Sequence, residues 1–147
     1  AARLNGHASR VYALLGDGEV QEGQIWEAAM TAAHYGLDNL VAILDRNRLQ
    51  IDGHTAEVMS IEPIADKWKA FGWHTLEVDG HDIGQLLEAF TVCRGVKGRP
   101  SMIIAHTVKG KGVSIFEGQK KYHGTAPNPE EYQQALKELG AGTGAPA

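Results

Sequence analysis

Short apolar runs alternate with longer segments of mixed polarity along this chain. Four of the runs have the length and composition of β-strands: Arg10–Leu15, Leu40–Asp45, Trp73–Val78 and Ser101–Ala105. The second run, LVAILD, is apolar at nearly every position, which is typical of a strand that is covered on both faces. The hydrophobic pattern therefore predicts four strands.

Segments with helical composition lie between the predicted strands. Glu22–Tyr35 carries an apolar stripe and is followed by Gly36, a residue type that commonly ends helices. Ser60–Phe71 is expected to begin with Ser60 as its capping residue and with Pro63 in an early helical position. These two segments predict the first two helices of the fold.

Two more helices are predicted in the second half of the chain. Asp82 is expected to cap the first of them. The apolar side of that helix is expected to consist of Ile83, Leu86, Leu87 and Phe90. The second helix is expected to start at Asn128-Pro129 and to end at Gly140.

Strand–helix–strand units repeat three times, which predicts an α/β fold: a doubly wound, mostly parallel sheet of about four strands with helices on both faces. Residues 1–139 form one domain in this interpretation, and residues 140–147, which are low in complexity, are expected to be a disordered tail. In sheets of this kind, ligands bind beyond the carboxyl ends of the strands. Three loops lie there: Gly16–Glu22, Arg46–Gly53 and His106–Gly124.

Composition narrows the classes of function. The net charge of −4 gives no indication of nucleic-acid binding, and no apolar run approaches the roughly 18 residues of a membrane helix. Cys93 is the only cysteine, so no disulfide can form within the chain and no cysteine cluster can bind a metal. A cytoplasmic location is expected, because a lone free cysteine fits a reducing compartment.

The first loop, Gly16-Asp17-Gly18, lies between a predicted strand and a predicted helix. Glycines there allow the backbone to approach a ligand closely, and a helix N-terminus offers unpaired N–H groups that suit a phosphate. The Asp17 carboxylate at the same place would repel a phosphate unless a cation lay between them. The loop therefore predicts a phosphate site with Mg²⁺ or Ca²⁺, with a plain turn and helix cap as the alternative.

Asn47 follows the second predicted strand, thirty residues after Asp17. Because neighbouring parallel strands end at the same edge of a sheet, these two side chains are expected to meet there. Asn47 offers a neutral oxygen, and a backbone carbonyl, two phosphate oxygens and a water can complete an octahedral metal site. The residues by themselves indicate an α/β domain that binds a phosphate and a hard cation.

The stretch GDGEVQEGQIWEAAMTAAHYGLDNLVAILDRNRLQIDG resembles the thiamine diphosphate motif of transketolases, in which GDG is followed some thirty residues later by Asn. The later TVKGKG and YHG stretches are similar as well, so the resemblance covers about Arg10 to Gly124. It implies the N-terminal diphosphate-binding domain or subunit of a transketolase, truncated at its N-terminus. The implied reaction transfers a two-carbon ketol unit between sugar phosphates, with thiamine diphosphate and Mg²⁺ or Ca²⁺ as cofactors.

The resemblance assigns roles to single residues. The metal ligands that it implies are Asp17, Asn47 and the backbone carbonyl of Leu49. The cofactor-binding residues that it implies are Gly16, Asp17, Gly18, Glu19, Asn47, Leu49, Ile51, Lys109 and His123. The catalytic residues that it implies are Glu22, Glu27 and His123, and the two glutamates lie at a subunit interface in the family. Since these glutamates are five residues apart, they do not stack on one helix face, and a shared acid–base role requires a partner surface.

Two parts of the family's site have no counterpart in this sequence: a long upstream segment, and the pyrimidine-binding domain, whose glutamate activates the cofactor in the family. The interpretation therefore requires a partner, which is a pyrimidine-binding domain or C-terminal subunit, together with a homodimer and a chain that is inactive alone. Truncation is also expected to expose apolar surface and to favour self-association. The alternatives are a non-catalytic module that binds thiamine diphosphate, and another ketol-transferring relative such as dihydroxyacetone synthase or deoxyxylulose-phosphate synthase.

Overall fold

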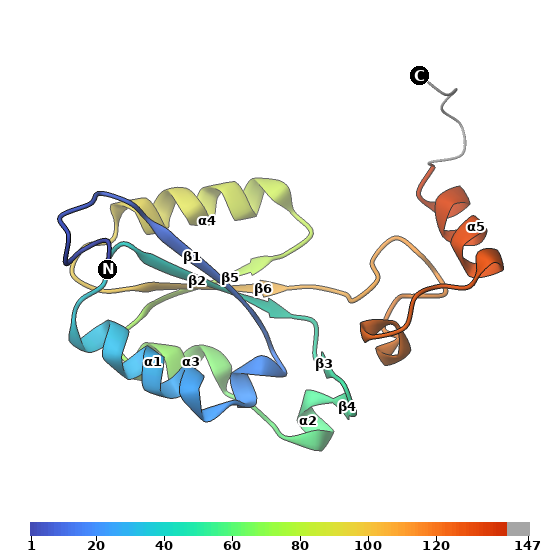
Figure 1. Ribbon diagram of the computed structural model, residues 1–147, viewed down its shortest axis with the longest axis horizontal. Coiled ribbons are helices and arrows are strands. Elements are labelled where there is room, and N and C mark those ends of the chain that lie inside the picture. Colours follow the sequence, from blue (N-terminus) through green and yellow to red (C-terminus); the bar gives the residue numbers. More distant parts are fainter. Residues whose placement is uncertain (141–147) are drawn as a thin grey trace.

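The computed structural model describes residues 1–140, and a four-stranded parallel sheet forms its centre (Figure 1). The strands are β1 (Val11–Gly16), β2 (Leu40–Arg46), β5 (His74–Asp79) and β6 (Ser101–His106). Their order across the sheet is β1-β2-β6-β5, and every neighbouring pair is parallel. All four predicted strands are confirmed, and each strand end lies within one residue of its predicted position.

Helices cover both faces of this sheet, as the hydrophobic pattern predicts. α1 (Gly23–His34) and α3 (Ile64–Ala70) lie on one face, and α4 (Ile83–Gly95) lies on the other (Figure 1). The fold is therefore the expected doubly wound α/β sheet. A short helix and a two-stranded ribbon between β2 and α3 are not indicated by the pattern: α2 (Thr55–Val58), β3 (Leu49–Gln50) and β4 (Gly53–His54).

The start of α3 differs from the prediction. The helix begins at Ile64, and its N-cap position is occupied by Pro63, which makes no side-chain capping bond. Ser60 does not cap this helix, because its hydroxyl oxygen accepts a hydrogen bond from the Glu62 backbone N–H at 3.3 Å. A serine paired in this way with a residue two positions on forms a local turn, which competes with the helix. The predicted Ser60 cap is therefore wrong.

α4 begins where it is expected but buries a different side. The Asp82 carboxylate accepts a hydrogen bond from the Gln85 backbone N–H at 3.1 Å, so the predicted cap is confirmed. Phe90 packs against the sheet as expected. Two residues of the predicted apolar side are exposed, Ile83 and Leu87. The buried residues are instead Ala89 and Cys93, because only small side chains fit where the helix lies closest to the sheet.

Aromatic side chains close the sheet face beneath α1 and α3. Trp68 of α3 is 1% exposed, and its ring centroid lies 4.9 Å from that of Trp73 and 5.4 Å from that of Trp26. The Trp73 indole N–H donates to the Ala29 carbonyl of α1 at 3.0 Å. The sheet contributes Leu44, Met102 and Ile104 to the same cluster. These contacts form one continuous core between the sheet and both helices.

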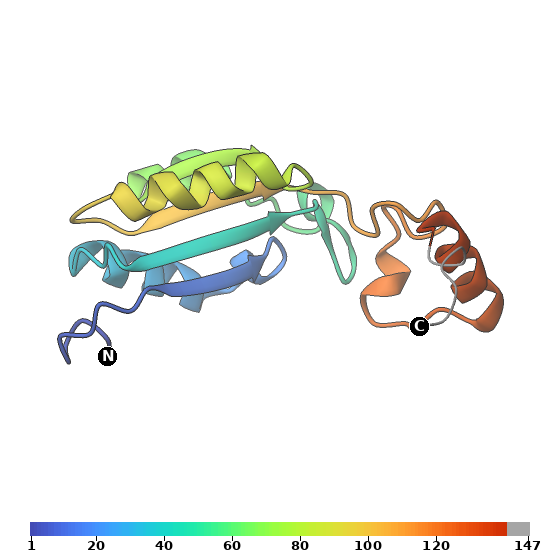
Figure 2. The same ribbon diagram turned by 90° about the horizontal axis from the view of Figure 1, so that it is seen from above.

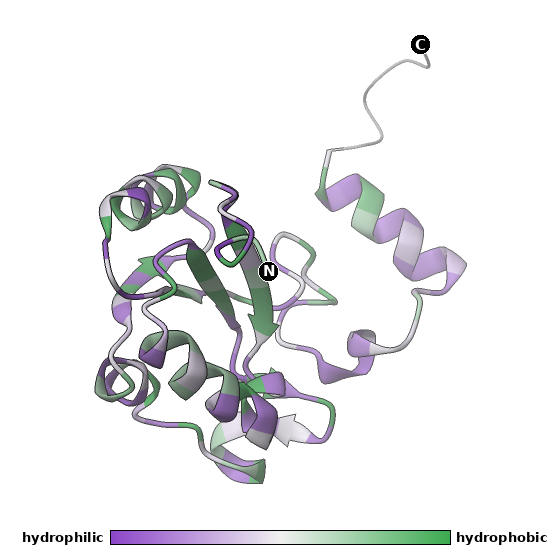
Figure 3. Ribbon diagram, turned by 60° about the vertical axis from the view of Figure 1, so that its left-hand side comes forward, coloured by the Kyte–Doolittle hydropathy of each residue, from purple (hydrophilic) through white to green (hydrophobic). Residues whose placement is uncertain are grey.

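The opposite sheet face is only partly covered. α4 packs over β5 and β6, whereas β1 is an edge strand with no helix above it (Figures 1 and 2). Tyr12 of β1 reaches Phe90 of α4, with ring centroids 5.7 Å apart. Leu14 lies two residues farther along β1, and therefore on the same face, but is 71% exposed. The face of β1 that carries Leu14 is thus left open, and Figure 3 shows the strand in the green of hydrophobic residues.

After β6 the chain leaves the sheet and folds into a separate small group of elements (Figure 2). The group contains the 3₁₀ turn η2 (Lys120–His123) and helix α5 (Pro129–Glu138). Asn128 and Glu131 cap α5 reciprocally, so the predicted start of this helix is confirmed. Residues 141–147 of the predicted tail lie outside the described part of the chain, so the tail stays a prediction. No helix within residues 1–140 is long and apolar enough to cross a membrane.

Candidate functional site

Three loops meet at the carboxyl edge of the sheet, because the strands that precede them, β1, β2 and β6, are neighbours in it. Together they line a cleft of about 610 Å³. All of the predicted cofactor-binding and metal-binding residues line this cleft, and so does Glu22. Four further residues line the cleft and are not predicted from the sequence: Gln21, Asp45, Gln50 and Asp52.

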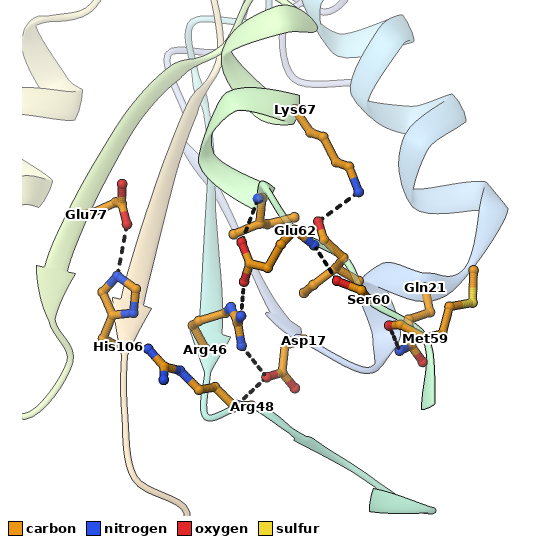
Figure 4. Close-up of polar contacts among 12 residues, drawn as sticks. Asp17, Gln21, Arg46, Arg48, Met59, Ser60, Glu62, Lys67, Glu77 and His106 are labelled. Atoms are coloured by element: carbon orange, nitrogen blue, oxygen red, sulfur yellow. Dashed lines mark hydrogen bonds and ion pairs between the residues drawn. The ribbon is translucent and has the colours of Figure 1, made fainter. Parts of the chain in front are cut away.

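Asp17 connects the first loop directly to the second. Its side chain is 1% exposed, and its Oδ2 accepts a hydrogen bond from the Arg48 backbone N–H at 2.5 Å. The same oxygen lies 3.5 Å from a guanidinium nitrogen of Arg46, which also forms an ion pair with Glu62 (Figure 4). The loops that carry Asp17 and Asn47 therefore touch, despite the thirty residues between them in the sequence.

The electrostatics of Asp17 fit a nearby cation. Burial raises the pKa of the Asp17 carboxyl above its usual value, although the Arg48 N–H and the Arg46 guanidinium oppose this shift. The groups of the protein thus compensate only part of the cost of a buried negative charge. A divalent ion at this carboxylate would supply the missing compensation, so the residues present fit a metal.

The second loop turns sharply at Arg48, which adopts the left-handed backbone conformation with φ 67°. The Asn47 Oδ1 accepts a hydrogen bond from the Leu49 backbone N–H at 3.0 Å, and one of its two acceptor positions remains available. Among residues 1–140, no group of three or more His, Cys, Asp or Glu side chains is arranged to hold a metal ion. A metal at Asp17 and Asn47 therefore requires backbone carbonyl, phosphate or water oxygens to complete its coordination.

Gly18 allows the first and second loops to approach each other. A Cβ atom at this position would lie 2.7 Å from the Cβ of Gln50, closer than side chains tolerate. Glu19 folds back onto its own loop, where its carboxylate accepts a hydrogen bond from the Gly16 N–H at 3.1 Å. A short 3₁₀ turn, η1 (Glu19–Gln21), separates this loop from α1, which begins at Gly23, within one residue of its predicted start.

The third loop brings two basic residues to the cleft. Lys109 lies shortly after β6, and His123 lies in η2, yet the Lys109 Nζ and the His123 Nδ1 are 3.4 Å apart. Lys109 is half-buried and His123 is exposed. The structure therefore brings this predicted pair together beside the loops that carry Asp17 and Asn47.

The two glutamates of α1 are placed differently. Glu22 occupies the N-cap position of α1 and lines the cleft. Glu27 lies farther along the helix, is exposed, and does not line the cleft. Any role of Glu27 in chemistry therefore depends on a surface from another chain or domain, and the catalytic assignments of Glu22, Glu27 and His123 stay predictions.

Sequence reasoning misses the ion-paired set of Arg46 and Glu62. One signal points to Arg46, which is a charged residue at the end of a strand whose first five residues are all apolar. No comparable signal exists for Glu62, because its role depends on where the segment before α3 packs.

Comparison with known proteins identifies the family of this chain. A sequence model described as the thiamine diphosphate-binding domain of transketolase matches residues 4–146. One of the subunits of apulose-4-phosphate transketolase from Phocaeicola vulgatus is 48% identical over 139 residues, which make up 95% of this chain and 50% of that protein. The 6-deoxy-6-sulfo-D-fructose transketolase subunit SqwG of a Clostridium species is 43% identical, with the same coverage.

Solved structures agree with this result. A transketolase from Campylobacter jejuni superposes with a TM-score of 0.85 at 31% identity and covers 91% of this chain, which corresponds to 21% of that protein. The chain thus belongs to the transketolase family, within its thiamine diphosphate-binding domain. It spans about half the length of the curated relatives described above and about a fifth of the solved transketolase.

Proposed function

We propose that this chain holds the metal and the diphosphate of thiamine diphosphate in a transketolase, which transfers a two-carbon ketol unit between sugar phosphates. The observation that carries the proposal is the buried Asp17 carboxylate, in direct contact with the loop of Asn47 and under-compensated by the protein's own charges. The family match supports the identity of the cofactor. Mg²⁺ or Ca²⁺ suits the all-oxygen donor set.

Each group in the cleft has a defined task in this proposal. Asp17, Asn47 and the Leu49 carbonyl would hold the metal, and Gly18 would let the backbone approach the diphosphate. Lys109 and His123 would offset its negative charge. Thiamine diphosphate, when bound, supplies the carbanion chemistry, while the protein binds and orients it.

A partner completes the enzyme in this proposal. Two of the similar proteins are themselves named as transketolase subunits, which supports a transketolase divided between chains. The partner would be a pyrimidine-binding domain or subunit that supplies the activating glutamate, and the assembly would be dimeric, with Glu22 and Glu27 at an interface. The names of these two relatives also suggest a donor sugar with a terminal phosphate or sulfonate. The chain without its partner is expected to be inactive.

Calorimetric titration with thiamine diphosphate, with and without Mg²⁺, tests the metal assignment. The chain alone is expected to bind the cofactor weakly or not at all, because half of the site belongs to the partner. With a pyrimidine-binding partner, Asp17→Ala is expected to abolish the dependence of cofactor binding on Mg²⁺. Asp66→Ala, which removes an exposed aspartate of α3, is the matched control and should leave that dependence unchanged. Mg²⁺ dependence retained by Asp17→Ala refutes the ligand assignment.

A steady-state assay of ketol transfer tests whether this chain needs a partner for activity. Ketol transfer by the purified chain alone would contradict the need for a partner. Ketol transfer by the reconstituted pair supports an enzyme, whereas cofactor binding by the pair without turnover supports the non-catalytic module.

A further inference from the structure

Arg46 occupies an unusual position for a charged residue. It ends the buried strand β2, and its side chain is only 8% exposed. The guanidinium lies between two carboxylates from different segments, Asp17 on one side and Glu62 on the other (Figure 4). One buried cation is therefore shared by two anions.

The two carboxylates are not equivalent. Asp17 is almost fully buried, and its Oδ2 receives both the Arg48 N–H and the Arg46 guanidinium. Glu62 has a side chain that is 47% exposed, and its Oε2 accepts a hydrogen bond from the Ile64 N–H at 2.9 Å. Glu62 is thus held in place at the start of α3 and can keep a cation without the help of Asp17.

The charges of this triad depend on whether a divalent ion is bound. Without it, Arg46 is the only charged side chain that forms an ion pair with Asp17 in the described part of the chain. With it, Asp17 would face a divalent cation and the Arg46 guanidinium together, and two cations at one carboxylate repel each other strongly where water is scarce. The repulsion becomes smaller when Glu62 neutralises Arg46.

We propose that Arg46 is a resident counter-cation of Asp17, which the divalent metal replaces, and that Glu62 retains Arg46 after this exchange. The proposal rests on the assignment of Asp17 as a metal ligand under Proposed function. It explains how a carboxylate can be buried before the metal binds: Arg46 keeps it charged and oriented. It also makes Glu62, which does not line the cleft, a determinant of metal affinity.

Two substitutions have opposite expected effects on metal binding. In the assembly reconstituted with a pyrimidine-binding partner and thiamine diphosphate, binding of Mn²⁺ can be followed by the paramagnetic resonance signal of the free ion. Arg46→Met removes the competing cation and is expected to tighten Mn²⁺ binding about tenfold. Glu62→Gln leaves Arg46 with Asp17 as its only carboxylate and is expected to weaken Mn²⁺ binding about threefold. Since Glu62 acts through Arg46, adding Glu62→Gln to Arg46→Met should change nothing further.

Thermal unfolding of the chain alone provides a second readout. Without metal, Arg46→Met should lower the melting temperature, because Asp17 then lacks its counter-charge. In the assembly, saturating Mn²⁺ and cofactor should restore most of that loss. The exposed pair Lys69 and Asp66 offers matched controls, since Lys69→Met and Asp66→Asn should alter neither readout.

The outcomes separate this inference from the proposed function. If Arg46→Met weakens Mn²⁺ binding, or if neither variant changes it while Asp17→Asn abolishes it, the counter-cation role is overturned and the metal ligand stands. If the unchanged assembly binds no Mn²⁺, both proposals fail. If Arg46→Met does not fold, the weakening expected from the half-exposed Glu62→Gln carries the test, and unchanged binding in that variant overturns the inference.

Discussion

Helices cover the two faces of the central sheet to different degrees. Under α1 and α3, three tryptophans fill the space between helices and strands, and the ion-paired carboxylate of the cleft lies at the end of this layer. Under α4, small residues form the contact, and the edge strand β1 leaves Leu14 exposed to solvent. The face under α1 and α3 is therefore expected to contribute more to the stability of the fold than the face under α4.

Loss of the closed core is expected to have the largest effect. Trp68→Ala removes the side chain at the centre of the tryptophan cluster and should lower the free energy of unfolding by about 3–5 kcal/mol. Urea denaturation followed by circular dichroism measures this change. Leu87→Ala on the exposed side of α4 is the control and should cost less than about 0.5 kcal/mol. Equal losses in the two variants would contradict the difference between the faces.

Loss of the aromatic contact on the open face is expected to cost less. Phe90 is partly buried between α4 and the sheet and touches Tyr12. Phe90→Ala should therefore lower the free energy of unfolding by about 2 kcal/mol, less than a fully buried aromatic residue would. The same denaturation experiment measures it, and a loss as large as that of Trp68→Ala would show that this face is as tightly packed as the other.

The open face also contains a histidine whose pKa is shifted by its surroundings. His74 lies on the same side of β5 as Leu76 and Val78, and burial, with a smaller contribution from Arg99, lowers its pKa below the usual 6.5. Because the folded protein resists protonation of His74, stability should fall as the pH drops below about 6.5, the pKa of the unfolded chain. Denaturation at pH 7.5 and pH 5.0 measures this slope. His74→Gln should reduce the slope, and an unchanged slope would rule out His74 as its source.

The smallest effect on stability is expected at the edge strand. Leu14→Lys places a charge on the exposed side of β1 and should change the free energy of unfolding by no more than about 0.5 kcal/mol. It should nevertheless reduce self-association of the isolated chain, because an exposed apolar edge strand can pair with the same strand of another copy. Sedimentation velocity over a range of concentrations compares the self-association of Leu14→Lys with that of the unchanged chain. If the unchanged chain remains monomeric throughout, the expectation of self-association is wrong.

The sequence predicts the sheet well because each strand is encoded by its own side chains. LVAILD is apolar at every position but its last, and this pattern is typical of a strand buried on both faces. The contact between the loops of Asp17 and Asn47 can also be predicted from the sequence, because neighbouring parallel strands end at the same edge of a sheet. Glu62 could not be predicted, because its contact with Arg46 depends on how the chain enters α3. The sequence also mispredicts that entry, because Ser60 forms a local turn and not the expected cap.

The order of the strands has a consequence for how the protein is made. β6 lies between β2 and β5 in the sheet but follows both in the chain. β5 therefore leaves the ribosome with no strand to pair with, and it must wait until residues 101–106 have been synthesised. Because the third loop follows β6 directly, the cleft can be assembled only after residues 101–123 have been synthesised, when β6 closes the sheet over long sequence distances. Pausing of translation before Ser101 would thus leave half of the sheet, β1 and β2, with Asp17 already present, while Lys109 and His123 of the cleft would not yet have been synthesised.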